Sequence, residues 1–488
     1  MTWTINRIPI IMSMRKYLSR CCTGMILSIA VYSCAPELNI REVDKSTPEG
    51  YTTSLDSTNS VKTNWRTYFQ DPILIALIDT ALHNNQELNI VLQEIEMERN
   101  EMDARKGEYL PFVHLGTGIG YDKVGRFTRP GAVEANNDIR PGVEFPELLG
   151  DYMLGAFADW EVDIWKKLRN SKKSQYFRYL SSIEGRNFMV TNLIAEIANT
   201  YYELLALDNE LEIAKQNIEI QNNAYNIVKV QKQTARVTEL AVRRFEAQVL
   251  DTRALQYKIQ QEIIETENRL NFLLGRFPRP IPRDPLIFSG LSPDTVLAGV
   301  PAQLLQNRPD IRQAEMELEA AKLNVKAARA QFYPSLGITG GLGYQAYNPR
   351  FLISTPESIL LGLAGEATMP LINRRAILAT YKNAGATQMQ AVINYEQVLL
   401  NAYIEVANQI ANIDNLQESY KLKEQQVEAL NASVNISNSL FMSARADYME
   451  VLLTQQEALE SRFELVETKM LQLHAWINVY RALGGGWN

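Results

Sequence analysis

Two long stretches of the chain carry apolar residues every three or four positions and contain neither glycine nor proline. They cover residues 186–274 and 386–483. Such runs, rich in alanine, leucine, glutamate, glutamine and lysine, favour helix once intrinsic propensity is summed over many residues. Residues 183–232 alone would form a helix of roughly 75 Å at about 1.5 Å per residue. That length exceeds a small domain, so we expect the helices to project. Alanines within the apolar stripe favour a bundle or a curved wall over a simple coiled coil.

A short break divides each helical stretch at a matching place. Residues 234–238 interrupt the first stretch and residues 443–447 interrupt the second, at an offset of 209 positions. We therefore predict one antiparallel helical hairpin in each stretch. Asp447 followed by Glu450 fits a capping box, in which both side chains satisfy free backbone N–H groups at a helix start.

Four shorter segments alternate apolar residues with polar or small ones, which is the period of a β-strand. They lie around residues 113–121, 154–165, 336–344 and 361–369. In the second segment one face is wholly apolar, and the other carries Asp159, Glu161 and Asp163. Each segment has about the ten residues that a transmembrane β-strand needs. A soluble antiparallel sheet with one face on a core is the alternative interpretation.

Membrane-spanning strands would require several copies of the chain. Four strands cannot close a barrel, and open strand edges are not tolerated in lipid. A charged side chain on a lipid-exposed face is destabilising, most strongly near the bilayer midplane. We therefore expect Asp159, Glu161, Asp163 and Glu366 to face a water-filled lumen, where they would wet the wall rather than form a specific binding site.

The chain is a tandem duplication. Residues 84–111 and 307–334 each run from a helix start to a proline 27 positions later (111 − 84 = 334 − 307 = 27), and the two are offset by 223. Leu274-Gly275 matches Leu483-Gly484 at offset 209, so the first copy is longer by 14 residues (223 − 209 = 14). We expect this excess in the polar loop at residues 122–150. Repeats govern a fold more strongly than any local motif.

Each copy should therefore contain a helix, two strands and a long helical hairpin, giving an α+β membrane protein. The predicted boundaries are residues 65–276 for the first repeat, 277–302 for a proline-rich linker and 303–488 for the second repeat.

The amino-terminal segment, residues 1–33, looks like an export signal. A basic region precedes an apolar stretch too short to span a bilayer, and Met14 is an alternative start to Met1. The segment ends Val-Tyr-Ser-Cys-Ala, which resembles the lipobox of bacterial lipoproteins. We expect a covalent lipid on Cys34, with a chance cysteine as the alternative. Polar residues 34–64 would then form an extended, lipidated tether.

Composition argues against several other classes. The formal net charge of −7 disfavours nucleic acid as a partner. Beyond the signal no apolar run is long enough for a membrane-spanning helix. Of the three cysteines, Cys21 and Cys22 fall in the signal, which leaves no internal disulfide. The three histidines lack metal-ligand spacing, and no phosphate-binding loop is present. We therefore expect no enzyme, no bound metal and no cofactor besides the lipid.

Three blocks of sequence point to a known family. The first spans residues 65–85 and includes Trp65 and Asp71-Pro72. The second contains Arg-Pro-Asp-Ile-Arg at residues 308–312 and Phe-Tyr-Pro-Ser-Leu at residues 332–336, and the third is residues 480–487. Together they resemble the outer-membrane efflux lipoproteins, the NodT-like branch of the TolC family, from about residue 60 to the last residue.

This resemblance implies a homotrimer in the bacterial outer membrane. Each protomer would give four strands to a twelve-stranded β-barrel, and the long helices would form a periplasmic α-barrel. Such ducts dock onto a periplasmic adaptor and an inner-membrane transporter, usually of the resistance-nodulation-division type. They release small molecules, including drugs, to the exterior.

The resemblance also places a narrow periplasmic aperture at the second hairpin tip. By position the aperture residues are Arg445, Asp447, Tyr448 and Glu450. The alternative is that these side chains only cap a helix or lie in solvent. Family members commonly have a glycine in each hairpin turn, whereas this chain has Ala235 and Ala444 near those positions. Alanine resists the positive φ that such turns use.

Three other functions are alternatives. Within the same class the chain could be a duct for type I protein secretion or for metal-ion efflux, for which Met442 and Met449 near the tip are the argument. Methionines at helical spacing more often serve packing. In a different class, the chain could be a periplasmic coiled-coil scaffold whose strands form a soluble sheet.

Overall fold

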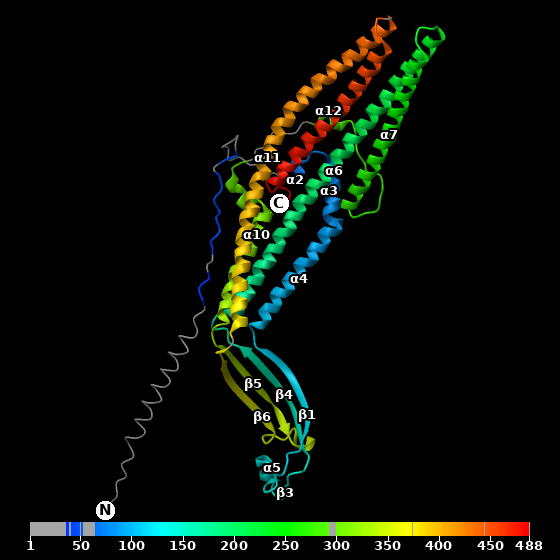
Figure 1. The fold of residues 1–488 in the computed structure, drawn as a ribbon. Helices are drawn as coiled ribbons and strands as arrows, with labels where there is room; N and C mark the ends of the chain where they lie inside the picture. Colours follow the sequence, from blue (N-terminus) through cyan, green and yellow to red (C-terminus); the bar gives the residue numbers. More distant parts are fainter. Residues whose placement is uncertain are drawn as a thin grey trace, which may run out of the picture. The chain divides into compact units, whose positions relative to one another are not determined.

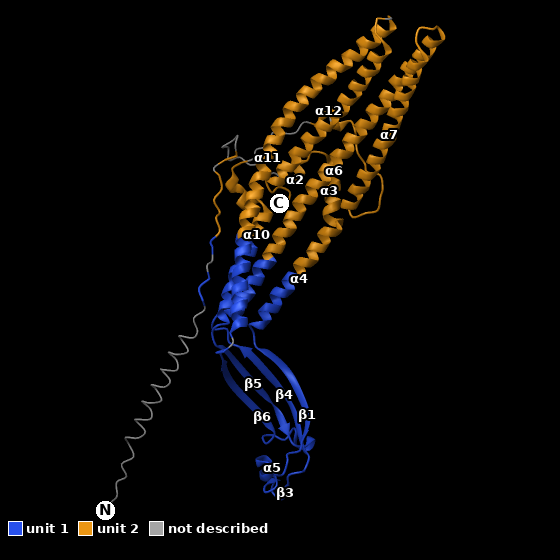
Figure 2. Cartoon of the chain, viewed as in Figure 1, with its two compact units in different colours: residues 1–42, 97–179, 316–392 blue, residues 43–96, 180–315, 393–488 orange. Residues whose placement is uncertain are grey.

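The computed structural model describes residues 36–38, 41–48, 50–51, 64–291, 299–372, 374–443 and 445–487. The predicted export signal, Cys34 and most of the predicted tether lie outside the described residues, as do Ala444 and part of the predicted linker. The chain divides into two compact units (Figure 2). Unit 1 consists of residues 1–42, 97–179 and 316–392, and unit 2 consists of residues 43–96, 180–315 and 393–488.

The main elements follow one another twice in the same order, as the duplication predicts (Figure 1). The first copy contains α4 (Gln86–Glu108), β1 (Phe112–Asp122), β4 (Leu149–Glu161), α6 (Lys167–Gln233) and α7 (Glu239–Leu273). The second copy contains α10 (Pro309–Ala330), β5 (Ser335–Ala346), β6 (Ile359–Thr368), α11 (Arg375–Met442) and α12 (Tyr448–Ala482).

Shorter elements fill the connections. They are α2 (Trp65–Tyr68), α3 (Pro72–Asn84), α5 (Arg129–Glu134), β2 (Asp138–Arg140), β3 (Val143–Glu144), α8 (Ile287–Gly290), η2 (Pro301–Gln303), α9 (Leu304–Asn307) and η3 (Pro349–Phe351). The loop between β1 and β4 has 26 residues (123–148) and the loop between β5 and β6 has 12 (347–358). The difference of 14 equals the predicted excess of the first copy, which therefore lies in this loop.

In unit 1 the four long strands form one antiparallel sheet in the order β1-β4-β5-β6. Residues directly opposite one another in such a sheet share a face. One face, which we call the apolar face, carries Val113, Leu115, Ile119, Leu154, Leu342, Leu361 and Leu363. In the single chain Leu115 is 85% exposed and Leu363 is 82% exposed. The opposite face, the polar face, carries His114, Phe157, Asp159, Glu161, Thr339 and Glu366.

Among the described residues, no helix has both the length and the apolar character needed to cross a bilayer.

Asp163 does not belong to the polar face, so the prediction that it lines a lumen is wrong. Strand β4 ends at Glu161, and the side chain of Asp163 is only 2% exposed. Its carboxylate accepts hydrogen bonds from the backbone N–H groups of Leu168 (3.1 Å) and Arg169 (2.9 Å) and from the Arg169 guanidinium (3.1 Å). The first N–H groups of a helix lack internal partners and favour negative charge. Asp163 therefore stabilises the start of α6. Because its carboxylate is turned toward these N–H groups, Asp163 does not continue the alternation of β4.

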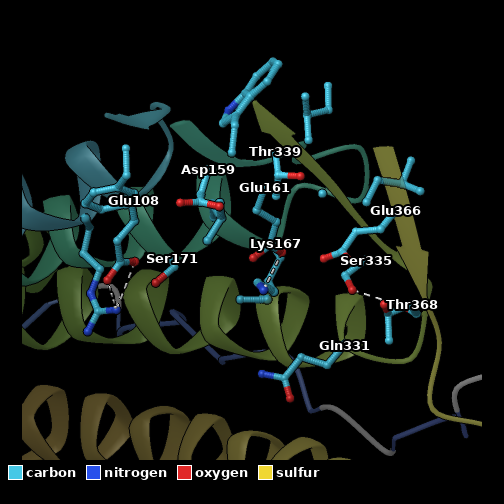
Figure 3. A pocket seen from close by; sticks show the side chains of 18 residues that line it. Glu108, Asp159, Glu161, Lys167, Ser171, Gln331, Ser335, Thr339, Glu366 and Thr368 are labelled. Atoms are coloured by element: carbon cyan, nitrogen blue, oxygen red, sulfur yellow. Dashed lines mark hydrogen bonds and ion pairs between the residues drawn. The ribbon is translucent and has the colours of Figure 1, made fainter. Parts of the chain in front are cut away.

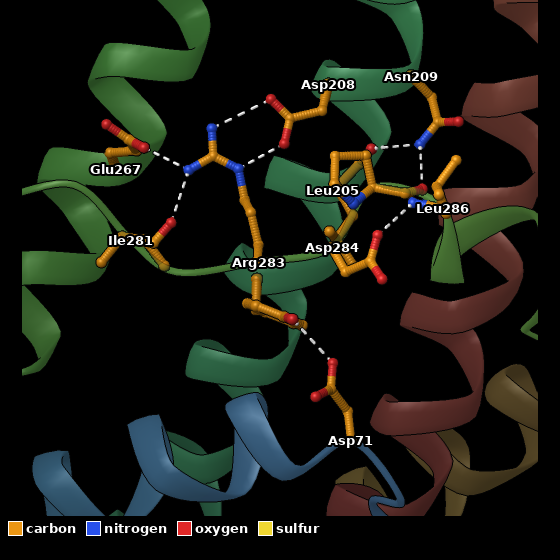
Figure 4. A network of polar contacts seen from close by, with 11 residues as sticks. Asp71, Leu205, Asp208, Asn209, Glu267, Ile281, Arg283, Asp284 and Leu286 are labelled. Carbon is orange, nitrogen blue, oxygen red and sulfur yellow. Dashed lines mark hydrogen bonds and ion pairs between the residues drawn. The ribbon is translucent and has the colours of Figure 1, made fainter.

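In unit 2 the segment that joins the two repeats is fastened to the first hairpin by Arg283 (Figure 4). The guanidinium bonds the carboxylate of Asp208 on α6, with one contact at 3.1 Å, and it also bonds Glu267 on α7. The Arg283 side chain is only 14% exposed. A buried cation with two carboxylate partners on different helices ties both helices to the segment, because losing either partner would leave charge uncompensated.

The tips of the two hairpins pack against each other through one apolar cluster, which we call the tip cluster. Its buried members are Val228, Ala241, Val242, Phe245, Val451 and Leu452. Tyr225, Val237, Phe441 and Tyr448 are partly buried against it. The predicted hairpins are confirmed, and the contact between them is made by side chains from both copies.

The first hairpin turn contains an alanine in the left-handed conformation. Ala235 has φ of 56°. The Arg236 N–H donates to the carbonyl of Gln231 (3.0 Å), and the Ala235 N–H donates to that of Lys232 (2.9 Å). This pattern closes the end of α6 as a Schellman motif, in which glycine normally occupies the left-handed position. The turn thus keeps its geometry without glycine, at the cost of local strain.

At the second turn the Arg445 N–H donates to the carbonyl of Leu440 (2.9 Å), which matches the first turn. Asp447 is the N-cap of α12, but its side chain makes no capping hydrogen bond, so the predicted capping box is wrong. The Asp447 carboxylate is exposed. Because water can hydrate this carboxylate, the unmade cap bond leaves no buried polar group without a partner.

We expect Ala235→Gly to stabilise the first hairpin turn by about 0.5–1 kcal/mol, because glycine adopts positive φ without the Cβ clash. Hydrogen–deuterium exchange of the turn amides should slow by roughly two- to fivefold. Ala254→Gly, at an exposed position within α7, is the matched control and should accelerate exchange, since glycine weakens a helix interior. Equal acceleration by both variants would contradict the strain at Ala235.

Asp163→Ala should weaken the start of α6 by about 1–2 kcal/mol, because two backbone N–H groups lose their acceptor. The same exchange measurement should show faster exchange at Leu168 and Arg169. Asp159→Ala, which removes a carboxylate from the neighbouring polar face, should leave these amides unchanged. Unaltered protection in Asp163→Ala would refute the capping role.

Candidate functional site

The polar face of the sheet carries three of the four carboxylates predicted to line a lumen (Figure 3). Glu161 on β4 and Glu366 on β6 both lie opposite Gly337 on β5, so they flank the same glycine. Glu161 forms an ion pair with Lys167 at 2.5 Å. Asp159 lies two residues back along β4, with its carboxylate 3.8 Å from the imidazole Nδ1 of His114. Both of these side chains are more than half exposed.

A hollow of about 650 Å³ adjoins these carboxylates in unit 1. Its ionisable lining consists of Arg105, Glu108, Asp159, Glu161, Lys167 and Glu366. Four carboxylates against two basic groups leave a formal charge of −2 (2 − 4 = −2). Arg105 is held by Glu101 and Glu108, each at 3.0 Å, and it belongs to α4 rather than to the sheet. The surface next to the polar face therefore favours cations over anions.

The predicted aperture residues lie together at the second hairpin tip. Arg445, Asp447 and Glu450 are exposed. Glu450 is the acidic residue in the first turn of α12, where the helix dipole favours negative charge. Tyr448 differs, since it is partly buried against the tip cluster. The tip thus presents two carboxylates and one guanidinium on a base held by apolar packing.

The two methionines near the tip contact polar groups of the first hairpin. The Met449 sulfur lies 2.9 Å from the Arg244 guanidinium, and the Met442 sulfur lies 4.0 Å from the Gln231 amide nitrogen. A guanidinium at a thioether disfavours a metal cation there, since like charges repel. Within the described ranges, no group of three or more histidine, cysteine, aspartate or glutamate side chains could hold a metal ion.

A contact that the sequence did not indicate fastens the amino-terminal segment to unit 2. Tyr51 is 4% exposed, and its ring stacks on Tyr403 of α11 with centroids 5.5 Å apart. Lys45 forms an ion pair with Glu315 at 2.5 Å. Burial raises the pKa of the Tyr51 hydroxyl, so it stays protonated. The polar composition of residues 34–64 hides these anchors, although an isolated aromatic residue in such a segment is a usable signal.

Comparison with known proteins identifies the family. The family model described as outer membrane efflux protein matches residues 77–276 and 300–485. The probable outer membrane lipoprotein SilC of Salmonella typhimurium is 27% identical, over 87% of this chain and 88% of its own length. The toluene efflux pump outer membrane protein TtgI of Pseudomonas putida is also 27% identical, over 86% of this chain and 87% of its own.

The fold has a close counterpart among solved structures. The open state of the MtrE outer membrane channel of Neisseria gonorrhoeae superposes with a TM-score of 0.80, covering 93% of this chain and 98% of that one, at 22% identity. These relatives are channel proteins and not enzymes. Two separate segments of the family model together account for most of the sequence. The chain therefore belongs to the outer membrane efflux protein family, and it is an efflux channel of the outer membrane.

Proposed function

We propose that three copies of this chain close into one duct, which passively conducts small molecules from a periplasmic adaptor and an inner-membrane transporter of the resistance-nodulation-division type to the exterior. The observation that carries the proposal is the sheet of unit 1. It pairs an exposed apolar face with two strand edges, on β1 and β6, that have no partner strand within the described chain.

Those two properties together require closure between copies. Exposed leucine and isoleucine side chains along strands of 10–13 residues suit the hydrocarbon of a bilayer. In that medium every backbone N–H and C=O needs a protein partner, so β6 of one copy must pair with β1 of the next. Three copies of four strands give a twelve-stranded barrel, with the polar face turned inward to water.

The hairpin tips support the proposed partnership with an adaptor. They expose charged groups at Arg445, Asp447 and Glu450, and the tip cluster beneath holds both hairpins of one copy together. A rigid end with charged, accessible side chains suits docking to another protein, and an adaptor would join this end to the transporter.

Small molecules are the better-supported cargo. The names of the relatives span toluene for TtgI and cations for CusC of Escherichia coli, so the family as a whole is not tied to one chemistry. Met442 and Met449 were the argument for a metal duct, and the guanidinium beside Met449 weakens it. The duct accepts what its transporter delivers, and selection lies in the transporter.

We further propose that the mature chain begins at Cys34 and carries lipid on that residue. The lipobox-like sequence supports this, and the buried anchor at Tyr51 keeps the segment that follows against the protein. A lipid chain gains roughly 0.8 kcal/mol per buried CH₂ and would hold the segment at the membrane surface.

The oligomeric state is the decisive test of the duct. Light scattering on the detergent-purified mature protein should give the mass of three chains, and the protein should remain in the membrane fraction after a high-salt wash. A monodisperse monomer that stays soluble without detergent would refute the proposal and would favour a periplasmic scaffold.

A second test addresses the aperture. In a trimer Asp447 and Glu450 would form rings of carboxylates around the axis, which concentrate field in a narrow opening and favour cations. Asp447→Ala with Glu450→Ala should raise single-channel conductance and weaken cation preference in planar bilayers. Glu457→Ala, seven residues further along α12, is the control and should change little, because it lies away from the tip. Identical currents in the double variant and the parent would exclude the aperture assignment.

A further inference from the structure

Phe157 lies in the middle of the polar face, an unusual place for a large apolar side chain. Its direct cross-strand partners are His114 on β1 and Gly341 on β5. Glycine also occupies four nearby positions of this face, at Gly116, Gly155, Gly343 and Gly362. On the other side of the ring the neighbouring positions are Phe112, Asp159 and Thr339. Glycine inside a strand weakens it and often marks a place where another group approaches closely. At Gly116, Gly155 and Gly341 the phenyl ring is such a group.

The ring lies flat on this bed of glycines. A Cβ atom added to Gly116 would lie 3.0 Å from one side edge of the ring, and a Cβ added to Gly341 would lie 2.7 Å from the opposite edge. A Cβ added to Gly155 would lie 3.3 Å from the ring tip. The two side edges of the ring thus approach glycines on the two neighbouring strands, and its tip approaches a glycine on its own strand. Only a ring whose plane is parallel to the sheet makes all three approaches. One π-face is therefore on the backbone and the other is presented outward.

The outward face of the ring opens into a hollow of about 570 Å³. Asp159 and His114 border the ring in this hollow, together with Thr339 and Ala364. The imidazole of His114 is tilted by 32° with its centroid 5.8 Å from that of Phe157. The carboxylate of Asp159 is exposed on the same face, two residues along the strand. A π-face and a carboxylate are thus offered side by side to whatever occupies the hollow.

Packing does not explain this arrangement. A phenylalanine that served a core would be covered by neighbouring side chains, whereas this one has glycines at both side edges and at the tip of its ring. The glycines instead keep the ring flat and its outer face free. A flat aromatic surface attracts cations through its quadrupole, most strongly those that are poorly hydrated.

We propose that Phe157 and Asp159 form a binding platform for organic cations, of the quaternary ammonium or phosphonium class, inside the duct. This rests on the proposed function, since closure as a trimer is what turns the polar face toward the lumen and brings three platforms around one axis. The ring supplies a cation–π contact and the carboxylate supplies charge. Weakly hydrated organic cations would dwell at the platform during exit, whereas small inorganic ions would pass.

The test is block of single-channel current by tetraphenylphosphonium in planar bilayers. Phe157→Leu keeps an apolar side chain and removes the π-face, and Asp159→Asn removes the charge. Each should raise the half-blocking concentration by about threefold or more, the size of an exposed cation–π contact. Met153→Leu, on the same face of β4, is the matched control and should block like the parent.

The outcomes separate the platform from the duct. Parent channels that conduct and are blocked, with Phe157→Leu blocked equally well, would overturn the platform. Block that depends on Asp447 or Glu450 and not on Phe157 would overturn it too, because the cation would then bind at the tip. A purified trimer that carries no current at all would instead refute the proposed function. Phe157→Tyr should restore block close to that of the parent, since tyrosine keeps the ring.

Discussion

The unpaired backbone edges of the sheet in unit 1 are the constraint on which the molecule depends. Strands β1 and β6 each leave a row of N–H and C=O groups along one side. In water such edges promote pairing with other chains and hence aggregation. In lipid the cost of leaving their backbone N–H and C=O groups without a partner is too high for a stable structure. In the proposed duct the apolar face lies in lipid, so the edges must be satisfied by other copies of the chain. Membrane insertion and oligomerisation would then be coupled, because each supplies what the other requires.

The two faces of the sheet carry different kinds of side chain. Alternation along a strand puts most leucine, isoleucine and valine side chains on one side and the carboxylates with most glycines on the other. The glycines have a second consequence. They make the polar wall thin and smooth, so the flat ring of Phe157 and the few side chains that project, chiefly Asp159, Glu161 and Glu366, determine what the wall presents.

The helical hairpins show how a duplicated sequence departs from symmetry. In both turns a backbone N–H donates to the carbonyl five residues earlier. A threonine caps the helix after the first turn, whereas the aspartate at the start of the next helix after the second turn leaves its cap bond unmade. The Thr238 hydroxyl is engaged in its capping bond from the Ala241 N–H. An uncommitted carboxylate at the tip is free for another task, which is why the second turn and not the first carries the proposed aperture.

The sequence by itself determined the duplication, the long hairpins, the four strands, their two faces and the location of the 14-residue excess, because each follows from local periodicity or from register between the copies. It does not determine where strand alternation ends and a helix cap begins, so alternation predicts the wrong surface for Asp163. The capping pattern likewise predicts a side-chain bond for Asp447 that the structure does not contain. Phe157 forms no usable sequence pattern, and Tyr51 is marked only as an isolated aromatic residue in a polar segment. Their roles depend on glycines from neighbouring strands and on a tyrosine some 350 residues away (403 − 51 = 352), and only the tertiary structure brings such positions together. Periodicity reports which side of an element a residue occupies, whereas contacts between elements depend on how those elements pack.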